Sequence, residues 1–340
     1  MSGASPQPVG RSSDQMRAVV YDNYGPPDVL RIEQVPKPEP ARDELLVKVR
    51  AAAVNRLDVH SREANASNGP VISLMSRLIF GVRGPRHRII GSEYSGEVER
   101  VGAAVRRFKP GDQVFGVTGL RFGANAEYVT VGERSRVSLK PVNASFDEAA
   151  GIADGFLNAA GCLRQVRLRP GSSVLVYGAS GSIGTAGVQL ARYRGATVTA
   201  VCQAKDFDLL RSLGASELID YTKDDFTRSG KTYDVVFDAV GKLAFSRCRA
   251  SLNPHGWYLP TDGAANLFLL PVTRLAGGKK VAIAVGSTNP QRDLAFLRQL
   301  VEAGHYRPVI DRVYEMNEVV EAARYVESRQ KVGNVVLRIP

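Results

Sequence analysis

The sequence predicts an α/β protein in two parts, a β-rich N-terminal domain followed by a doubly wound parallel sheet. Short strand-like runs separated by turn residues fill the first 140 residues. After about residue 145, strand-like and helical patterns alternate. In the middle of the chain, a glycine-rich turn joins a β-branched strand to an amphipathic helix. At 340 residues, two domains are expected.

The N-terminal part opens with a polar segment, residues 1–15, which predicts a disordered tail and not a signal peptide. Residues 62–90 have no clean period, and we expect a loop that forms a lid or an edge of the substrate site. Alternating apolar residues predict strands over 16–21, 29–34, 44–51, 94–101 and 127–131. Together they predict a barrel-like β domain over residues 16–145.

The second part is expected to begin with one helix over residues 146–167, which has two acidic residues in its first turn. Further helices are expected over 207–213, 244–252, 291–303 and 317–327, and strands over 173–177, 197–202, 218–220, 233–239, 257–259, 280–285 and 334–339. Right-handed crossovers between such strands produce a doubly wound sheet, here over residues 146–288, with ligands at the carboxyl ends of the strands. Residues 289–340 return to mixed structure.

The turn after the strand 173–177 has the composition of a dinucleotide-binding loop. Ala179, Gly181 and Gly184 form A-x-G-x-x-G, one residue short of the usual fingerprint. Small residues allow a tight turn, a close approach to a pyrophosphate, and close packing of the helix on the strand. The first N–H groups of the helix then face the phosphates. We therefore predict a Rossmann domain that binds a nicotinamide cofactor through Gly178, Ser180, Gly181, Ser182, Ile183 and Gly184.

The end of the next strand favours NADPH over NADH. An NAD-specific domain needs a carboxylate there for the ribose 2′-OH, and Cys202 stands at about that position. Lys205 follows and can pair with a 2′-phosphate, although it also fits a solvated loop. Asp206 has nearly the right spacing but is predicted to cap the next helix.

The net charge of +11 arises from basic residues spread along the chain. We interpret it as a solvated basic surface that also attracts an anionic cofactor. A cofactor-bound protein that binds nucleic acid or another partner, with little catalysis, is the alternative from another class. The nearest basic cluster comprises Arg77, Arg83, Arg86, His87 and Arg88. No apolar run approaches the roughly 18 residues that a membrane span needs.

The cysteines and histidines are isolated, and their spacing matches no zinc site. No metal is therefore predicted. Scattered single cysteines favour a reducing, cytoplasmic setting. The residues concerned are Cys162, Cys202, Cys248, His60, His87, His255 and His305.

Several segments resemble the signatures of the medium-chain dehydrogenase/reductase superfamily, including AAAVNRLD, GSEYSGEVERVGAAVRRFKPGDQVFG, VLVYGASGSIGTAGVQLAR, YDVVFDAVG and the closing GNVVL. The branch that the chain resembles most is the zinc-independent quinone oxidoreductase group. This resemblance implies a GroES-like catalytic domain, a Rossmann cofactor domain and an active site in the cleft between them. It also implies a homodimer joined edge to edge through the Rossmann sheet.

Two departures from the zinc alcohol dehydrogenases of this superfamily imply that zinc is absent. Those enzymes carry Cys where Asn55 stands, and His followed by Glu where Ser92 and Glu93 stand. Their structural-zinc cysteines also have no counterpart here. The resemblance thus implies an NADPH-dependent reductase of a quinone or an α,β-unsaturated carbonyl. An NAD(P)-dependent alcohol or aldehyde dehydrogenase is the alternative, which is harder to support without zinc to polarise a carbonyl.

Hydride transfer to such a substrate builds negative charge on the carbonyl oxygen, so the site needs hydrogen-bond donors. Asn55 is the first candidate, and Tyr94 and Tyr128 are weaker ones that also fit an aromatic core. Asp58 either orients a neighbour or makes a structural hydrogen bond.

The segment 151–160 departs from the related pattern. Asn158 replaces a Thr near the nicotinamide and can still hydrogen-bond the carboxamide, while Asp154 and Phe156 replace an apolar and a small residue. By resemblance, Tyr221 lies near the adenosine phosphate, and the loop 285–287 and Gly333–Asn334 close over the nicotinamide. The remaining expected cofactor contacts are Gln203, Val240, Gly241, Gly286, Ser287 and Asn334.

Overall fold

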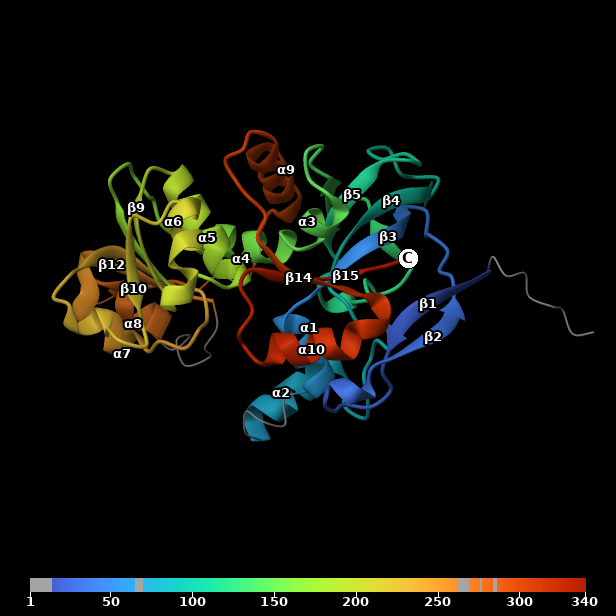
Figure 1. Ribbon diagram of the computed structural model, residues 1–340, viewed down its shortest axis with the longest axis horizontal. Coiled ribbons are helices and arrows are strands. Elements are labelled where there is room, and N and C mark those ends of the chain that lie inside the picture. The colour runs from blue at the N-terminus through green and yellow to red at the C-terminus, as the bar shows by residue number, and fades with distance from the viewer. Residues whose placement is uncertain (1–13, 65–69, 262–268, 276, 284–285) are drawn as a thin grey trace, which may run out of the picture.

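The computed structural model describes residues 14–64, 70–261, 269–275, 277–283 and 286–340. Within them the chain forms an α/β domain and a β-rich domain that lie side by side (Figure 1). The tail predicted over 1–15 lies outside the described residues as far as residue 13, whereas Gln15 already belongs to the first strand.

The α/β domain is built on a sheet of six parallel strands in the order β10-β9-β8-β11-β12-β13. The strands are β8 (Ser173–Tyr177), β9 (Thr197–Cys202), β10 (Glu217–Asp220), β11 (Tyr233–Asp238), β12 (Leu252–Pro260) and β13 (Lys280–Val281). The central strands β8 and β11 are apolar and almost fully buried, as expected for a sheet covered on both faces. The strand order reverses between β8 and β11, which confirms the doubly wound prediction.

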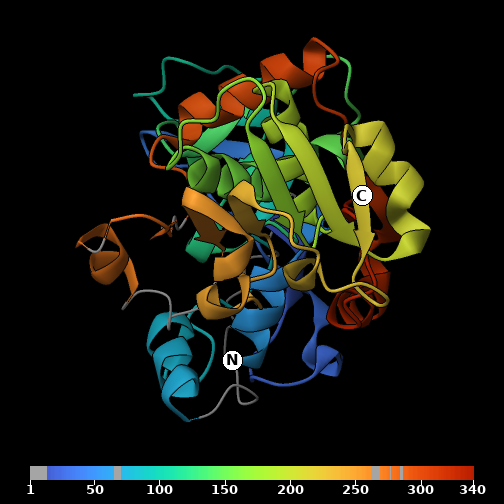
Figure 2. The ribbon, with the colours of Figure 1, turned by 90° about the vertical axis from the view of Figure 1, so that its left-hand side faces the viewer.

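Helices cover both faces of this sheet (Figure 2). On one face, a core cluster contains residues of α4 (Ala153–Leu163), α5 (Ser182–Tyr193), α6 (Phe207–Leu213) and α9 (Pro290–Glu302). On the other face, a second cluster contains residues of α7 (Phe245–Cys248) and α8 (Leu269–Leu275).

The β-rich domain has β3 (Glu44–Val54) at its centre, paired antiparallel with β4 (Glu93–Val101), β6 (Tyr128–Gly132) and β15 (Asn334–Arg338). On one side β5 (Gln113–Val117) and β7 (Arg136–Leu139) extend the sheet beyond β4. On the other side β14 (Ile310–Glu315) lies parallel to β15. A separate ribbon consists of β1 (Gln15–Val20) and β2 (Arg31–Pro36). The last part of the chain therefore completes the sheet of the first domain.

The β-rich domain also contains the helices α1 (Arg56–Glu63), α2 (Pro70–Phe80), α3 (Phe146–Ala150) and α10 (Val319–Glu327); α3 and α10 contact the sheet, and α2 contacts α1. Single 3₁₀ turns occur over Pro27–Val29 (η2), Gly119–Arg121 (η4), Ala204–Asp206 (η5), Phe226–Arg228 (η6), Arg249–Ser251 (η7) and Met316–Glu318 (η9).

Two predictions of local structure were wrong. The expected irregular segment 62–90 contains α2, whose pattern is obscured because it exposes the apolar side chains of Leu74, Leu78 and Ile79. The helix expected over 146–167 is divided into α3 and α4 at Gly151. A Cβ at Gly151 would lie 2.8 Å from Ile310 Cδ1 and 2.9 Å from Asn334 Cβ. The C-terminal strands therefore pack too closely at this point for a side chain.

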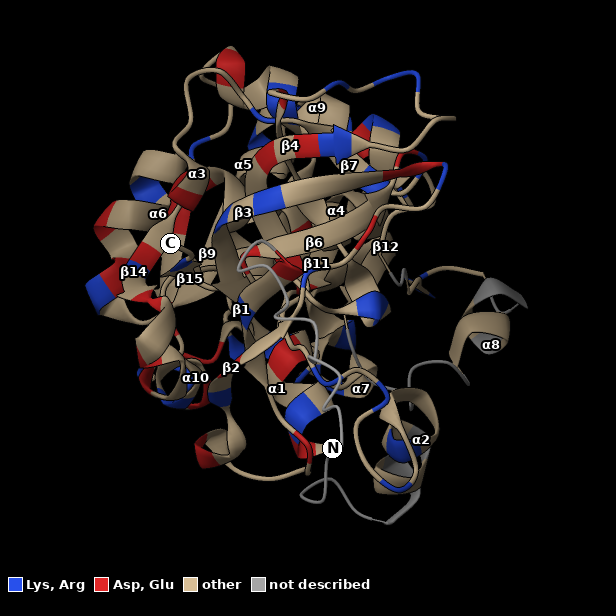
Figure 3. Cartoon of the chain, turned by 90° about the vertical axis from the view of Figure 1, so that its right-hand side faces the viewer, with Lys and Arg blue, Asp and Glu red and all other residues tan. Residues whose placement is uncertain are grey.

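Acidic and basic residues are interspersed over the β-rich side of the molecule (Figure 3). The side chains of the basic cluster over residues 77–88 have different partners. Arg88 forms ion pairs with Asp22 and Glu33, whereas the guanidinium group of Arg77 lies over the ring of Tyr24. Among the described residues, no helix has both the length and the apolarity that a membrane span requires.

Candidate active site

The loop between β8 and α5 has the backbone geometry of a phosphate-binding turn. Gly178 has φ +72°, and a Cβ there would overlap the side chain of Val240. A Cβ at Gly184 would lie 2.7 Å from the backbone of Ala179. Gly181 is the N-cap of α5 and provides no side-chain cap. The first N–H groups of α5, those of Ser182 and Ile183 included, therefore have no acceptor within the helix and are available to a pyrophosphate.

The C-terminal segment closes against this loop. The N–H of Gly333 donates to the carbonyl of Ser180 at 2.7 Å, and Gly181 and Gly333 form a parallel bridge. Asn334 is buried, and its amide donates to the carbonyl of Val309 at 3.1 Å. The structure thus places Gly333 against the glycine loop, while the Asn334 amide already has a protein partner. Their closure over the nicotinamide stays a prediction.

Cys202 ends β9 at the position where a ribose-binding carboxylate is usual, and the nearest carboxylates, those of Asp206 and Asp220, are buried. The amide of Gln203 donates to the hydroxyl of Tyr221 at 2.9 Å, and Tyr221 is 48% exposed. Lys205 is exposed beside them. Asp206 occupies the N-cap position of α6. The prediction that Asp206 is the N-cap of this helix is therefore confirmed, although its side chain makes no capping hydrogen bond.

The turn after β11 lies over the turn after β8. The N–H groups of Val240 and Gly241 donate to Asp238 Oδ1 at 3.1 and 2.9 Å. The hydroxyl of Tyr258 donates to Asp238 Oδ2 at 3.1 Å. These bonds hold Val240 against Gly178 at the switch point of the sheet.

The loop that precedes α9 is only partly described, because residue 285 lies outside the described residues. Gly286 packs so closely on α4 that a Cβ at Gly161 would overlap its carbonyl. The hydroxyl of Ser287 donates to the carboxylate of Asp293 and accepts from the N–H of Asn289 at 3.0 Å. In this arrangement Ser287 is engaged with the start of α9.

A buried polar network lies at the start of α1. Asn55 caps the helix, since its side-chain oxygen accepts from the N–H of Leu57 and of Asp58. Asp58 accepts in return from the N–H of Asn55 at 2.9 Å. The Asn55 amide nitrogen donates to Ser92 Oγ at 2.8 Å and to Glu93 Oε2 at 3.2 Å. Asn55 therefore organises this network, and it can donate to a substrate only by releasing one of these acceptors.

Glu93 joins this network to the Rossmann domain. Its Oε1 accepts from the N–H of Asp154, the second residue of α4, at 2.7 Å. Within α4 only Asp154 and Asn158 are partly exposed, and they lie one turn apart on the same side. One turn of α4 contacts the nucleotide loop, because a Cβ at Gly155 would overlap Ser182 Oγ. The network and the nucleotide loop thus meet at the first turn of α4.

Burial controls the charge of this network. It raises the pKa of Glu93 to about 8, with a further contribution from the nearby Asp154. Burial also raises the pKa of Asp58 to about 7 and raises that of Asp154. The same effect lowers the pKa of Lys331 to about 8, and its amine donates to the carbonyl of Gly333 at 2.6 Å. Burial thus shifts all three carboxyl groups toward their neutral forms, and Glu93 is mostly protonated near pH 7.

These residues do not fit a zinc ion. Asn55, Ser92 and Glu93 offer an amide, a hydroxyl and a carboxyl group that hydrogen-bond to one another. Zinc sites in proteins are built mainly from thiolate and imidazole ligands. Over the described part of the chain, His, Cys, Asp and Glu side chains form no group of three that could hold a metal.

The remaining candidates lie away from this network. Tyr94 follows Glu93 on the opposite face of β4 and is fully buried in the core of the β-rich domain, where its hydroxyl has no partner among the described residues. The ring of Tyr128 lies 3.6 Å beneath the amine of Lys37, beside β1 and β2. Phe156 is buried in the Rossmann core, with its ring 5.7 Å from that of Tyr306. These positions favour packing roles.

Sequence reasoning did not identify Lys331, and it used Glu93 only for comparison with zinc enzymes. A signal for Lys331 was its position two residues before Gly333. No local signal identifies Glu93, because its pairing with Asn55 and Asp154 joins residues that are 38 and 61 positions away.

Comparisons with known proteins agree with this architecture. Residues 41–142 match the family model of the alcohol dehydrogenase GroES-like domain, and residues 213–337 match that of the zinc-binding dehydrogenases. The chain is 32% identical over 335 residues to the quinone-oxidoreductase QR1, chloroplastic, of Triphysaria versicolor, covering 95% of this chain and 98% of that one. It is 31% identical over 337 residues to the NADPH-dependent alkenal/one oxidoreductase, chloroplastic, of Arabidopsis thaliana, covering 95% and 79%.

Among solved structures, the quinone oxidoreductase from Coxiella burnetii superimposes with a TM-score of 0.84 at 26% identity, over 96% of this chain and all of that one. These matches confirm the predicted Rossmann and GroES-like domains. The chain therefore belongs to the medium-chain dehydrogenase/reductase superfamily, in its quinone-oxidoreductase-like branch.

Proposed function

We propose that this protein is a zinc-independent reductase that transfers hydride from NADPH to a quinone or an α,β-unsaturated carbonyl. The observation that carries the proposal is the network of Asn55, Ser92 and Glu93, which joins the nucleotide loop through Asp154. Asn55 and Ser92 stand where zinc enzymes of the superfamily carry Cys and His, and an amide and a hydroxyl replace the thiolate and imidazole that zinc sites mainly use. The names of the relatives support the same reaction class.

The residues of this chain would then bind, orient and tune the charge of the site. The nicotinamide supplies the hydride when bound. The loop from Gly178 to Gly184 and the start of α5 hold the pyrophosphate. Asn158 lies on the exposed side of α4, from which its amide can reach the carboxamide, although its nitrogen also donates to the carbonyl of Asp154 at 2.9 Å.

The charge of the buried network is the second contribution of these residues to the reaction. Reduction of a conjugated carbonyl builds negative charge on its oxygen, and a nearby carboxylate would oppose that charge. Burial raises the pKa of Glu93 to about 8, so that Glu93 is mostly protonated near pH 7, and it also raises the pKa of Asp154. Lys331 lies close enough to act on both. The network is therefore compatible with an anionic transition state, and solvent can protonate the product enolate.

The finer assignments are also proposals. NADPH is favoured because Cys202 ends β9 and Gln203 and Lys205 follow it. The nearest carboxylates, those of Asp206 and Asp220, are buried, and Asp220 accepts from Thr222. We further propose a cytoplasmic location and a homodimer joined through an edge of the Rossmann sheet, at β10 or β13. Some relatives are named as chloroplastic or mitochondrial proteins.

The test is a titration of the purified protein with NADPH and NADH, followed by turnover assays with a simple quinone and an enone, with and without a chelator. We expect tighter binding of NADPH and turnover that the chelator does not change. Loss of activity with the chelator would contradict zinc independence. Oxidation of alcohols with NAD in place of quinone reduction would favour the dehydrogenase alternative. Cofactor binding without turnover of either acceptor would favour a non-catalytic binding protein.

A further inference from the structure

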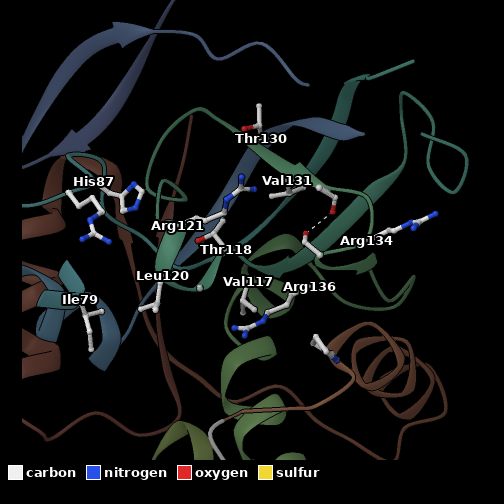
Figure 4. A pocket seen from close by; sticks show the side chains of 15 residues that line it. Ile79, His87, Val117, Thr118, Leu120, Arg121, Thr130, Val131, Arg134 and Arg136 are labelled. Carbon is white, nitrogen blue, oxygen red and sulfur yellow. Dashed lines mark hydrogen bonds between the residues drawn. The ribbon is translucent and has the colours of Figure 1, made fainter. Parts of the chain in front are cut away.

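A cavity of about 730 Å³ opens in the β-rich domain between α2, η4, the turn from β6 to β7 and the start of α9 (Figure 4). Figure 4 shows Ile79 and Leu120 together on one side of this cavity, and Arg136 beside Val117. Its apolar lining consists of Ile79, Val117, Leu120, Val131 and Pro290. An apolar group of drug-like size therefore fits here.

The charged side chains that line the cavity are all arginines: Arg86, Arg121, Arg134 and Arg136. Burial lowers the pKa of His87, which also lines the cavity and is therefore neutral near pH 7. No Asp or Glu is among the lining residues. Arg121 lies 3.4 Å from Glu44, whereas Arg134 and Arg136 form no ion pair with any described residue. The intervening Glu133 is turned away, because its carboxylate accepts from the backbone N–H groups of Arg106 and Arg107. Arg134 and Arg136 thus give the cavity a positive potential that no ion pair of the described residues neutralises.

The cavity borders the buried network. Val117, in its wall, is the register partner of Glu93 on β4. The N–H of Thr118 donates to the carbonyl of Ser92 at 2.9 Å, and Thr118 also lines the cavity. The positive charge of Arg136 acts on the carboxyl group of Asp154 and opposes the effect of burial on its pKa. A molecule in the cavity would therefore extend toward the first turn of α4 and the nucleotide loop.

We propose that this cavity binds an anionic group of the substrate, so that the natural substrate is a quinone or enone that carries a carboxylate or a phosphate on an apolar body. This inference rests on the proposed reductase function and specifies its substrate class. Planar guanidinium groups bind both kinds of anion through paired hydrogen bonds. The isolated arginines and the apolar wall together select for a molecule with both properties.

The test compares two substrates of nearly equal size, 4-carboxybenzylideneacetone and its carboxamide, in NADPH-dependent turnover. We expect kcat/KM to be about 10-fold higher for the carboxylate at low salt, since a hydrogen bond to a charged group has that effect or more. Added salt should reduce this ratio. Arg134→Gln and Arg136→Gln should each reduce it several-fold. Arg83→Gln, an exposed arginine of the same basic segment outside the cavity lining, should leave it unchanged.

A comparison of the inhibition constants of benzoate and phenyl phosphate identifies whether the cavity prefers a carboxylate or a phosphate. A carboxylate-to-carboxamide ratio near one, with the carboxamide reduced, would overturn this inference and leave the proposed function intact. If neither compound is reduced, the proposed function fails. Calorimetric titration of benzoate and benzamide then tests the anion-binding cavity independently of turnover. Binding of benzoate that both arginine variants weaken supports the cavity assignment, whereas equal binding or no binding of the two compounds overturns it.

Discussion

The placement of the pyrophosphate can be tested at Gly181. This glycine has φ −76° and ψ 173°, which alanine adopts without strain. A Cβ there would have the carbonyl of Gly178 as its nearest protein neighbour, at 3.7 Å, which is an ordinary contact. Gly181→Ala should therefore change the free energy of unfolding by less than about 1 kcal/mol, because a small loss at the helix N-cap is offset by a less flexible unfolded chain.

The same methyl group would stand where the backbone approaches the cofactor. Displacing the pyrophosphate weakens one or two hydrogen bonds to a charged group, each with a value of about 1.5–3 kcal/mol. The Kd for NADPH should therefore rise about 10- to 100-fold. Fluorescence titration with NADPH measures the binding, and urea denaturation without cofactor measures the stability.

Gly184→Ala is the matched contrast. Its Cβ would overlap the carbonyl of Gly178 and lie 2.7 Å from Ala179, so the loop and α5 must separate. We expect a loss of about 1–3 kcal/mol in unfolding free energy as well as weaker binding. An unchanged Kd in Gly181→Ala would refute the assigned pyrophosphate position. Unchanged stability in Gly184→Ala would refute the packing argument.

Three further predictions concern charge and the C-terminal segment. Burial raises the pKa of Glu93 from 4.5 to about 8, so its stabilising contribution is complete below about pH 4.5 and is lost as the pH rises through 8. Unfolding free energies measured with urea across this range should fall more steeply in the wild type than in Glu93→Gln, and parallel curves would contradict the shift. Lys205→Glu should raise the KM for NADPH about 10-fold and leave the KM for NADH unchanged. The exposed Lys223→Glu should change neither KM. Gly333→Ala should cost about 1–3 kcal/mol in thermal denaturation and weaken NADPH binding, because φ is +69° and the Cβ would overlap the carbonyl of Val309. Gly304→Ala has φ +73° and open space around it, so an equal effect on cofactor binding there would refute a specific role for Gly333.

Much of the fold could be predicted because its determinants are local. The unit formed by β8, α5 and β9 follows from a β-branched strand, closely spaced small residues and an amphipathic helix, all within 30 residues. The observed bounds of α6 are those expected for residues 207–213. By contrast, β7 and β14 were not predicted, and α2 was taken for an irregular segment. The sequence patterns of these elements are weak. Pairing with neighbouring strands forms β7 and β14, and exposed apolar side chains obscure the period of α2.

The candidate site was predicted less completely than the fold. Signature segments mark both the glycine loop and the region of Gly333, and the structure shows that the two are in contact. Their roles at the cofactor stay predictions. Asn55 was chosen as a free donor, yet the structure shows its amide bonded to Ser92 and Glu93. Sequence patterns show which polar groups exist, but they do not show which groups already satisfy one another.

By itself, the sequence determined the doubly wound domain, the phosphate-binding loop and the absence of the usual zinc ligands, because residue type and short-range spacing decide each of these. Only the tertiary structure decided which side chains meet: Glu93 with Asn55 and Asp154, and the arginines of three separate segments around one cavity. It also decided their charge. Burial, which is a property of the packed chain, disfavours ionised carboxyl groups and thereby changes the pKa of Glu93 and Asp58.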